Sequence, residues 1–329
     1  MSAAISRRGV FQGAAALALG LGVARRAKAC SAVVLDDYCA NGVHDVSAAL
    51  RAGPVELLAR DYECLPVRFA PRDVLRGVPG RSRLLFEANA PAFSPVAPDQ
   101  PTDSFTFEDF DVQCEAPGAV GAQSGFYLAS CRRFWLRRIT VSDFAGSGVL
   151  VYGQRIAFLP GPGAPSIDRP CGWVGDEWQC GGVRAPSDAT MGVMEDLNIR
   201  RCWIGIHLTG TPAPEGVPRV KGGAANMHSI IRPICSNNRS DGIQIWQGAS
   251  NYVEKPILGQ NARHGIALGW YNNLIPGATC ERNGGWGIWR APVKEQRGNE
   301  WPNLHDGGSN GLGLVSPDSS ALARREVGR

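Results

Sequence analysis

No stretch of the sequence reaches the roughly 18 consecutive apolar residues that a membrane span needs. None of its ten cysteines forms the C-x-x-C pair of a zinc or redox site. Glycine is abundant, with 41 of 329 residues, but it lacks the three-residue period of collagen. Because 44% of the residues are hydrophobic and only 19% are charged, a disordered polymer is also excluded. We therefore expect a soluble globular protein.

Net positive charge is confined to the start of the chain. The formal net charge is +4, and residues 1–29 contain five cationic residues and no acidic one. The cations are Arg7, Arg8, Arg25, Arg26 and Lys28. Subtracting these five charges from +4 leaves −1 for the remainder. A nearly neutral body gives no electrostatic reason to expect nucleic acid or an anionic membrane as a partner.

Residues 1–29 have the pattern of a secretory signal. Two arginines, Arg7 and Arg8, precede a short apolar run at 13–23, and a small-x-small sequence ends at Ala29. The paired arginines resemble the twin-arginine type of bacterial signal, which exports folded proteins. An ordinary secretory signal is the alternative. Either signal predicts a periplasmic or secreted protein, a compartment in which disulfide bonds form. We predict one between Cys171 and Cys180, which flank a polar loop.

A repeat of about 22 residues runs through most of the chain. Its mark is a glycine followed by alternating apolar residues, and most intervals are 22–24 residues. The glycines are Gly125, Gly148, Gly205, Gly242, Gly265, Gly287 and Gly311. Two further columns keep the same step: Asn238, Asn261 and Asn283 lie four residues before their glycines, and Cys235, Leu258 and Cys280 lie seven before.

These columns predict an all-β fold, a right-handed parallel β-helix with one repeat per coil. Asparagine side chains stacked at one corner could hydrogen-bond along the axis. Cys235 and Cys280 are predicted to be small buried hydrophobic residues. The β-helix domain would span residues 30–315, followed by a loose tail at 316–329.

The N-terminal part resembles the opening of pectate-lyase-like and phage-tailspike β-helix proteins. The resemblance is carried by residues 35–50 and 74–84. It implies a short helix that caps the open end of the solenoid, with Asp45 as its N-cap and Gly53 as its terminator. Such a cap protects the exposed sheet edges from aggregation.

Two insertions interrupt the repeat, at about 154–190 and 212–226. Both follow a glycine-marked strand, so both are predicted to leave one corner and border one lateral face. The first carries Asp176 and Glu177, which are candidate substrate-binding residues.

The positions one before and two after each glycine are predicted to face outward. Coils lie about 4.8 Å apart, so Asp241 and His264 should be adjacent, with His207 and Gln244 close by. The predicted surroundings are Trp203, Trp246, Trp270, Trp286 and Trp289, flanked by Arg239 and Arg263. Indole rings combined with charged hydrogen-bonding groups are suited to a saccharide.

The sequence around Asp241-Gly242 and, one coil later, His264-Gly265 resembles polygalacturonase strands. The resemblance implies that Asp241 is an acid tuned by His264. However, Trp203-Ile204-Gly205 stands where the family has Asn-Thr-Asp, and no Arg-Ile-Lys follows. Hydrolysis of a glycoside usually needs two carboxylates, and a second one would have to come from the insertion.

A single acid beside histidine and basic residues is better suited to β-elimination or epimerisation of a uronate. The candidate bases are His264, His207, Arg239 and Arg263. We predict a lyase that acts on an acidic polysaccharide, with two alternatives: a glycoside hydrolase, or a non-catalytic polysaccharide-binding or envelope protein. An Asp before Gly is also common turn chemistry. Calcium is a cofactor of several β-helix lyases, but the sequence identifies no acidic cluster that would hold it.

A second group of charges lies ten residues before the repeat glycines. It consists of Arg138, Arg232 and Lys255 together with Glu195. We interpret this group as solvated surface on a different face.

Overall fold

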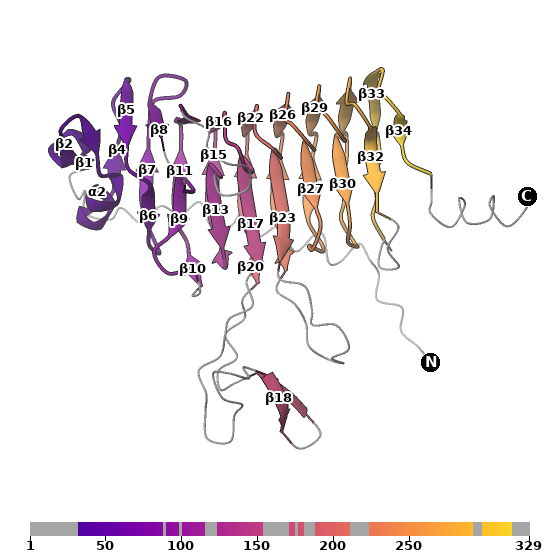
Figure 1. The fold of residues 1–329 in the computed structure, drawn as a ribbon, viewed down its shortest axis with the longest axis horizontal. Helices are drawn as coiled ribbons and strands as arrows, with labels where there is room; N and C mark the ends of the chain where they lie inside the picture. Colours follow the sequence, from indigo (N-terminus) through magenta and orange to yellow (C-terminus); the bar gives the residue numbers. More distant parts are fainter. Residues whose placement is uncertain are drawn as a thin grey trace, which may run out of the picture. The chain divides into compact units, whose positions relative to one another are not determined.

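The computed structural model describes residues 32–87, 90–98, 101–115, 124–153, 171–174, 177–180, 188–210, 224–291 and 298–317. In these residues the chain forms short strands that stack coil upon coil along one axis (Figure 1). Four stacked sheets result, which we name A to D.

Within every sheet the strands follow one another along the stack in chain order. Sheet A contains β1 (Val33–Val34), β4 (Val55–Glu56), β7 (Val74–Arg76), β11 (Thr106–Glu108), β15 (Trp135–Arg137), β21 (Val193–Glu195), β25 (Ser229–Ile231) and β28 (Tyr252–Glu254). Sheet B contains β2 (Cys39–Ala40), β3 (Val43–His44), β5 (Asp61–Cys64), β8 (Arg83–Phe86), β12 (Asp111–Cys114), β16 (Thr140–Ser142), β22 (Asn198–Arg200), β26 (Ile234–Ser236), β29 (Ile257–Gly259), β31 (Thr279–Glu281) and β33 (His305–Gly308).

Sheet C contains β6 (Val67–Phe69), β9 (Phe93–Pro95), β13 (Phe126–Ala129), β17 (Val149–Gly153), β23 (Ile206–Gly210), β27 (Ile243–Ile245), β30 (Ile266–Leu268), β32 (Trp286–Arg290) and β34 (Gly313–Val315). Sheet D is short and contains β10 (Thr102–Asp103), β14 (Cys131–Arg132), β20 (Ala189–Thr190) and β24 (Ala225–Asn226). A separate antiparallel pair is formed by β18 (Cys171–Val174) and β19 (Glu177–Cys180).

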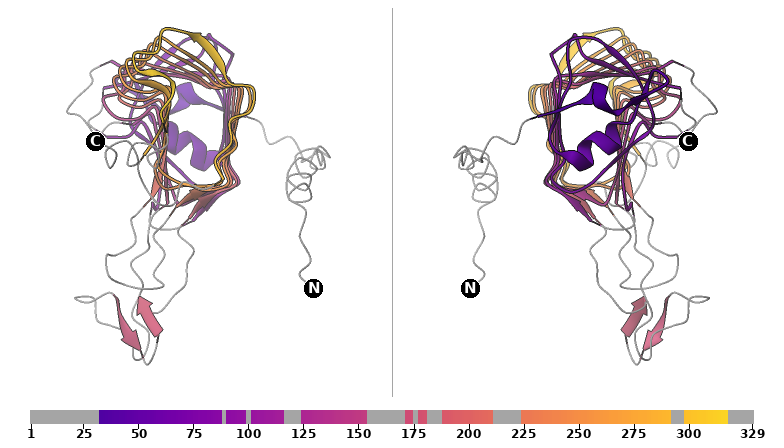
Figure 2. Two further views of the ribbon diagram at one scale, coloured as in Figure 1. Left: turned by 90° about the vertical axis from the view of Figure 1, so that its right-hand side faces the viewer. Right: turned by 90° about the vertical axis from the view of Figure 1, so that its left-hand side faces the viewer.

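Each coil passes through sheet A, then sheet B, then sheet C, and neighbouring coils pair in parallel register. The fold is therefore a right-handed parallel β-helix, as the repeat predicts. Viewed along the axis, the coils overlie one another around a common interior (Figure 2). The one antiparallel pairing at the start of sheet B joins β2 to β3.

A short helix closes the N-terminal end, also as predicted. Helix α2 (Val46–Ala52) follows the 3-10 turn η1 (Leu35–Tyr38), and in the end-on view it lies across the interior of the coils (Figure 2). The Asp45 side chain accepts the N–H of Ala48 at 2.9 Å, which makes Asp45 the N-cap. The helix ends at Gly53, whose N–H donates to the carbonyl of Ala49.

The interior changes character along the axis. In the N-terminal coils phenylalanine rings stack across neighbouring strands, as in Phe93 on Phe126 with centroids 4.7 Å apart. Phe105 and Phe134 form a similar stack at 5.3 Å. In later coils the inward positions are aliphatic or cysteine residues. Cys235 and Cys280 are fully buried in register with Leu258, as predicted.

Asparagine columns hold the later turns together. The side-chain N–H groups of Asn238, Asn261 and Asn283 each donate to the Oδ1 of the next asparagine, at 2.9 Å in every case, and the column ends at Asn310. The predicted column is thus confirmed and is one residue longer than predicted. A second, unpredicted column links Asn251, Asn273 and Asn299 at a different corner.

The glycine column reflects close backbone approach between coils. A Cβ atom placed on Gly242 would lie 2.7 Å from the carbonyl oxygen of Gly265 in the next coil, which is closer than real Cβ contacts. The column runs as predicted from Gly125 to Gly287. The prediction that Gly311 is the last member of the column is wrong. Trp286 pairs with Gly313 and Ile288 with Val315, so Gly311 lies three residues before the position in register with Gly287.

The predicted signal at residues 1–29 lies outside the described residues, and so do residues 318–329 of the predicted tail. Ser316, predicted to start that tail, still bonds to the solenoid, because its N–H donates to Ile288 and its hydroxyl accepts the N–H of Arg290. None of the helices in the described residues is both long and apolar enough to cross a membrane.

Candidate functional site

The outer face of sheet C carries part of the predicted site. Side chains alternate along each strand, so the residue two positions after each repeat glycine points away from the interior. Parallel pairing aligns these residues into one row across six coils. The row is Tyr127, Leu150, His207, Gln244, Ala267 and Trp289.

The two insertions both follow strands of sheet C. Gly153 and Gly210, the last residues of β17 and β23, are paired neighbours, so both insertions leave the same corner, as predicted. Asp176 lies outside the described residues, and the side chain of Glu177 is not described. Cys171 and Cys180 have backbones directly opposite each other in the β18–β19 pair. Their disulfide stays a prediction.

His207 is a neutral imidazole on this face. It lies between Leu150 and Gln244 on the adjacent strands. Burial lowers the pKa of His207 to about 4. A histidine with this pKa is uncharged near neutral pH, and one ring nitrogen is then free to accept a proton.

Three nearly parallel rings form an aromatic platform, which we define as Trp246, Trp289 and His264. The rings of Trp246 and Trp289 have centroids 6.4 Å apart and an interplanar angle of 8°. The His264 ring stacks on Trp289 at 5.2 Å and 5°. Trp246 is 41% exposed, so this platform offers an indole surface to a ligand.

Arg263 lies beside the platform. Its Cζ is 5.7 Å from the centre of the Trp289 ring, and its Nε is 3.3 Å from Oδ1 of Asp241. The arginine side chain is 48% exposed, whereas the Asp241 side chain is fully buried. Arg263 therefore brings a positive charge to the platform from a buried anchor.

The prediction that Asp241 faces outward is wrong. The residues one position before each glycine lie in the turn ahead of the strand, where alternation does not apply, and most of them are buried. The buried ones are Ser124, Ser147, Ile204, Asp241 and His264. Oδ1 of Asp241 accepts the N–H of His264 in the next coil at 3.1 Å, which confirms that the two are adjacent but gives Asp241 a structural contact. Burial raises the pKa of Asp241, against the opposing effect of Arg263.

His264 occupies the position of Asp241 in the next coil and is bound in the same way. Its Nδ1 accepts the N–H of Trp286 at 2.9 Å, so in the neutral ring the proton is on Nε2. Burial, together with the charge of Arg263, lowers the pKa of His264 to about 4. With Nδ1 occupied, this imidazole has no free acceptor for a substrate proton.

The other predicted residues are more dispersed than expected. Trp203 and Arg239 are exposed in the turns between sheets B and C. Trp270 stacks on Tyr271 at 5.6 Å, beyond the far end of β30. Trp286 packs over the position of Gly313 in the last coil. Of the five predicted tryptophans, only Trp246 and Trp289 stack on each other in the described part of the chain.

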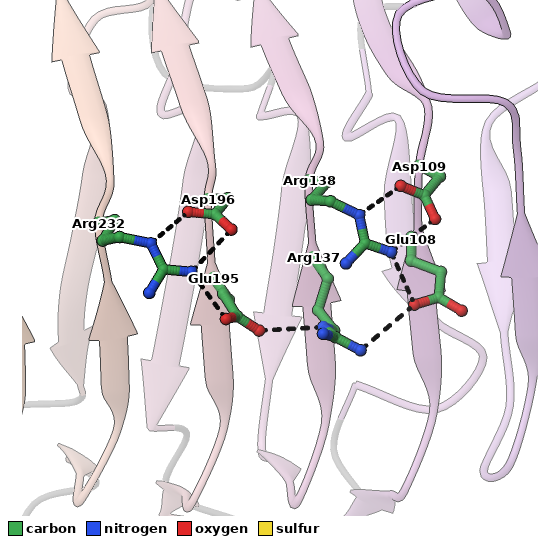
Figure 3. A network of polar contacts seen from close by, with 7 residues as sticks. All are labelled: Glu108, Asp109, Arg137, Arg138, Glu195, Asp196 and Arg232. Atoms are coloured by element: carbon green, nitrogen blue, oxygen red, sulfur yellow. Dashed lines mark hydrogen bonds and ion pairs between the residues drawn. The ribbon is translucent and has the colours of Figure 1, made fainter.

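The charges near Arg138 form a continuous network at the turn between sheets A and B (Figure 3). Arg138 binds Asp109 through two hydrogen bonds of 2.6 and 2.7 Å. Arg232 binds Asp196 in the same way, and the contact lowers the pKa of that carboxyl group. Glu108, Arg137 and Glu195 link these two pairs across the coils. The interpretation of these residues as a separate surface is consistent with this arrangement, although they are paired rather than merely solvated.

The described residues offer no metal site, and the two cysteines of the repeat column are buried. Within those ranges, no three His, Cys, Asp or Glu side chains are grouped so that they could hold a metal ion. Cys235 and Cys280 are buried thiols without a disulfide partner, and burial raises the pKa of Cys280 to about 12.

The sequence matches no family model and no curated protein. Similarity appears only among solved structures. The A-module of the mannuronan C-5 epimerase AlgE6 from Azotobacter vinelandii is 11% identical, with 87% of this chain and 99% of that chain covered and a TM-score of 0.42. PfbA, a surface adhesin of Streptococcus pneumoniae, is 11% identical, with coverage of 83% and 90% and a TM-score of 0.43. Tailspike protein 3 of bacteriophage CBA120 is 10% identical, with coverage of 88% and 60% and a TM-score of 0.33.

The likeness to these structures is confined to the fold. This chain is a parallel β-helix protein. At sequence identities of 10–13%, nothing about the activity of these proteins carries over to this chain.

Proposed function

We propose that this protein is exported, binds an acidic polysaccharide along the outer face of sheet C and cleaves it by β-elimination. The observation that carries the proposal is the row on sheet C, where consecutive coils place a neutral imidazole and an amide next to an aromatic platform flanked by a cation. Successive coils repeat every 4.8 Å or so, which gives a linear polymer a series of regularly spaced contacts.

His207 is the proposed base. In β-elimination of a uronate, a base removes the proton beside the carboxylate, the bond to the leaving glycosidic oxygen breaks, and that oxygen takes up a proton from water. The neutral ring of His207 can accept the proton beside the carboxylate. Gln244, its paired neighbour on β27, can donate a hydrogen bond to the charge that develops on the carboxylate. His207 and Gln244 take over the roles predicted for Asp241 and His264. The Asp241 carboxylate already accepts the N–H of His264, and the His264 ring already accepts the N–H of Trp286.

Hydrolysis receives less support. It usually requires two carboxylates around the scissile bond, and the described strands of sheet C contribute no aspartate or glutamate to the outward row. A non-catalytic polysaccharide-binding protein is the second candidate, favoured by the exposed indole of Trp246, because a stacking surface suffices for binding.

A product assay on the purified protein separates these functions. The protein is incubated with uronic and with neutral polysaccharides, with and without calcium. β-Elimination creates an unsaturated sugar that absorbs ultraviolet light, whereas hydrolysis creates reducing ends without this absorbance. We expect ultraviolet absorbance from at least one uronic polymer. Reducing ends alone would favour hydrolysis, and binding without either product would favour the second candidate.

A further inference from the structure

Arg263 contacts Asp241 and Trp289, and its remaining hydrogen-bond donors are not used by described residues. Its Nε faces Oδ1 of Asp241 at 3.3 Å, and its guanidinium lies over the Trp289 ring. Within the described part of the chain, this guanidinium makes an ion pair but no hydrogen bond. No described residue accepts a hydrogen bond from either Nη group, and the 48% exposure of the side chain makes both accessible to a ligand.

Asp241 is suited to position this arginine, but it is too buried to contact a ligand itself. Its side chain is completely buried, and its Oδ1 also accepts the N–H of His264. Its Oδ2 is buried without a hydrogen-bond partner in the described residues. A buried carboxylate in this state depends on the nearby cation for compensation. The attraction therefore keeps Arg263 at this corner of sheet C.

The position of Arg263 next to the platform matters for the kind of sugar that binds. A guanidinium offers planar, paired donors that match a carboxylate, and it is favourable over an aromatic face. A neutral sugar could use the indole of Trp246 but would leave this charge unused. A uronate residue could use both.

We propose that Arg263 is the carboxylate-recognition residue of the sheet C face, with Asp241 as its positioning residue. The terminal nitrogens bind a uronate carboxylate, while the indoles of Trp246 and Trp289 contact the sugar. This inference rests on the proposed function and specifies its substrate class. Arg263 precedes β30, two coils beyond His207 on β23, about 10 Å along the axis. The polymer must therefore carry a uronate at a second position, separate from the residue that reacts.

The test is a calorimetric titration of the full chain with defined probes. The probes are oligogalacturonate and oligomannuronate, each compared with the same oligosaccharide after its carboxyl groups have been reduced to alcohols. The variants are Arg263→Gln, Arg263→Lys and the control Arg282→Gln. Arg282 is an exposed arginine in the turn after β31, one coil further on, with no side-chain partner in the described residues. The two Gln variants each remove one positive charge, and Arg263→Lys keeps it.

We expect wild type to prefer at least one charged oligosaccharide over its reduced form. Arg263→Gln should weaken binding of that charged probe by roughly 10- to 100-fold, the loss expected for paired charge-assisted hydrogen bonds. It should leave the reduced probe unaffected. Arg263→Lys should be intermediate, because an ammonium keeps the charge but not the paired geometry. Arg282→Gln should match wild type.

Three results would overturn the inference while leaving the proposed function intact: Arg263→Gln keeps the preference, it weakens both probes equally, or Arg282→Gln loses the preference to the same extent. If wild type binds neither form of either oligosaccharide, the proposed function itself is wrong. Thermal unfolding of each variant separates loss of a contact from loss of folding.

Discussion

Two charged regions of this solenoid differ in how their charges are satisfied. At the turn between sheets A and B, Arg138 and Arg232 are each bound by two hydrogen bonds to an aspartate of the preceding coil (Figure 3). On sheet C, Arg263 has one ion pair to a buried carboxylate and no hydrogen bond to described residues, beside exposed indole. We therefore base the proposed binding site on incomplete pairing beside an aromatic surface, and not on abundance of charge.

The largest expected effect is on activity at sheet C. His207→Ala should lower the rate of elimination by roughly 10²- to 10⁴-fold, the usual contribution of a positioned base. Because the pKa of His207 is lowered to about 4, the wild-type rate should be constant near neutral pH and fall as the pH drops through about 4. The measurement is kcat/KM against pH.

His305→Ala provides the matched control, since His305 is exposed in β33 and outside the site. Full activity in His207→Ala would remove the assignment of His207 as the base and weaken the contrast between the two regions.

The asparagine column should affect stability and not chemistry. Asn261→Ala removes the acceptor of two bonds from Asn238 and the donors to Cys235 and Asn283. Leaving these buried groups unpaired should lower the free energy of unfolding by about 4 kcal/mol. Denaturant unfolding measures the loss. Asn198→Ala, a partly exposed position on β22, is the control and should be nearly neutral; an equal loss in both variants would contradict the role of the column.

Acid should destabilise the folded protein through buried histidine. The His228 ring accepts the N–H of Gly192 and donates to Ala189, and burial lowers its pKa to about 4 from an ordinary value of 6.5. The unfolded chain therefore binds a proton at a pH where the folded chain does not. Stability is complete above pH 6.5 and should fall by about 3 kcal/mol between pH 6.5 and 4 from this residue alone.

Unfolding free energies measured across this pH range give the slope. His228→Gln should have a shallower slope than wild type, by about one proton in the linkage relation. A pH-independent stability in wild type would show that His228 is not neutral in the folded state.

The smallest effect is expected at the paired turn. Arg138→Met keeps the aliphatic stem and removes the charge, and should lower the free energy of unfolding by less than about 1 kcal/mol. The difference from wild type should shrink further in high salt. A loss of several kcal/mol would mean that the exposed network contributes as much as the buried columns.

The fold was predictable from the sequence because each coil repeats the same steric demands. Gly242 and Gly265 recur since a Cβ there would meet the backbone of the next coil, and Asn261 recurs since each turn needs the same acceptor. Extending the asparagine column to Asn310 would have placed Leu314, and not Gly311, in register with Gly287. The alternating Gly-Leu sequence at 311–314 obscured this.

The site was predictable only where strand alternation decides the direction of a side chain. His207 and Gln244 lie within strands and face outward as predicted. Asp241 precedes its strand, where the turn directs the carboxylate to the N–H of His264. The stacking of Trp289 with His264 depends on side-chain packing between coils, which the repeat does not encode.

The central claim is that the outer face of sheet C is the polysaccharide-binding surface. A crystal structure of the protein with a bound oligouronate tests it most directly. The account predicts a sugar ring against Trp246 and Trp289, with a carboxylate at the terminal nitrogens of Arg263. A sugar bound on sheet A or B, with the outer face of sheet C empty, would contradict it.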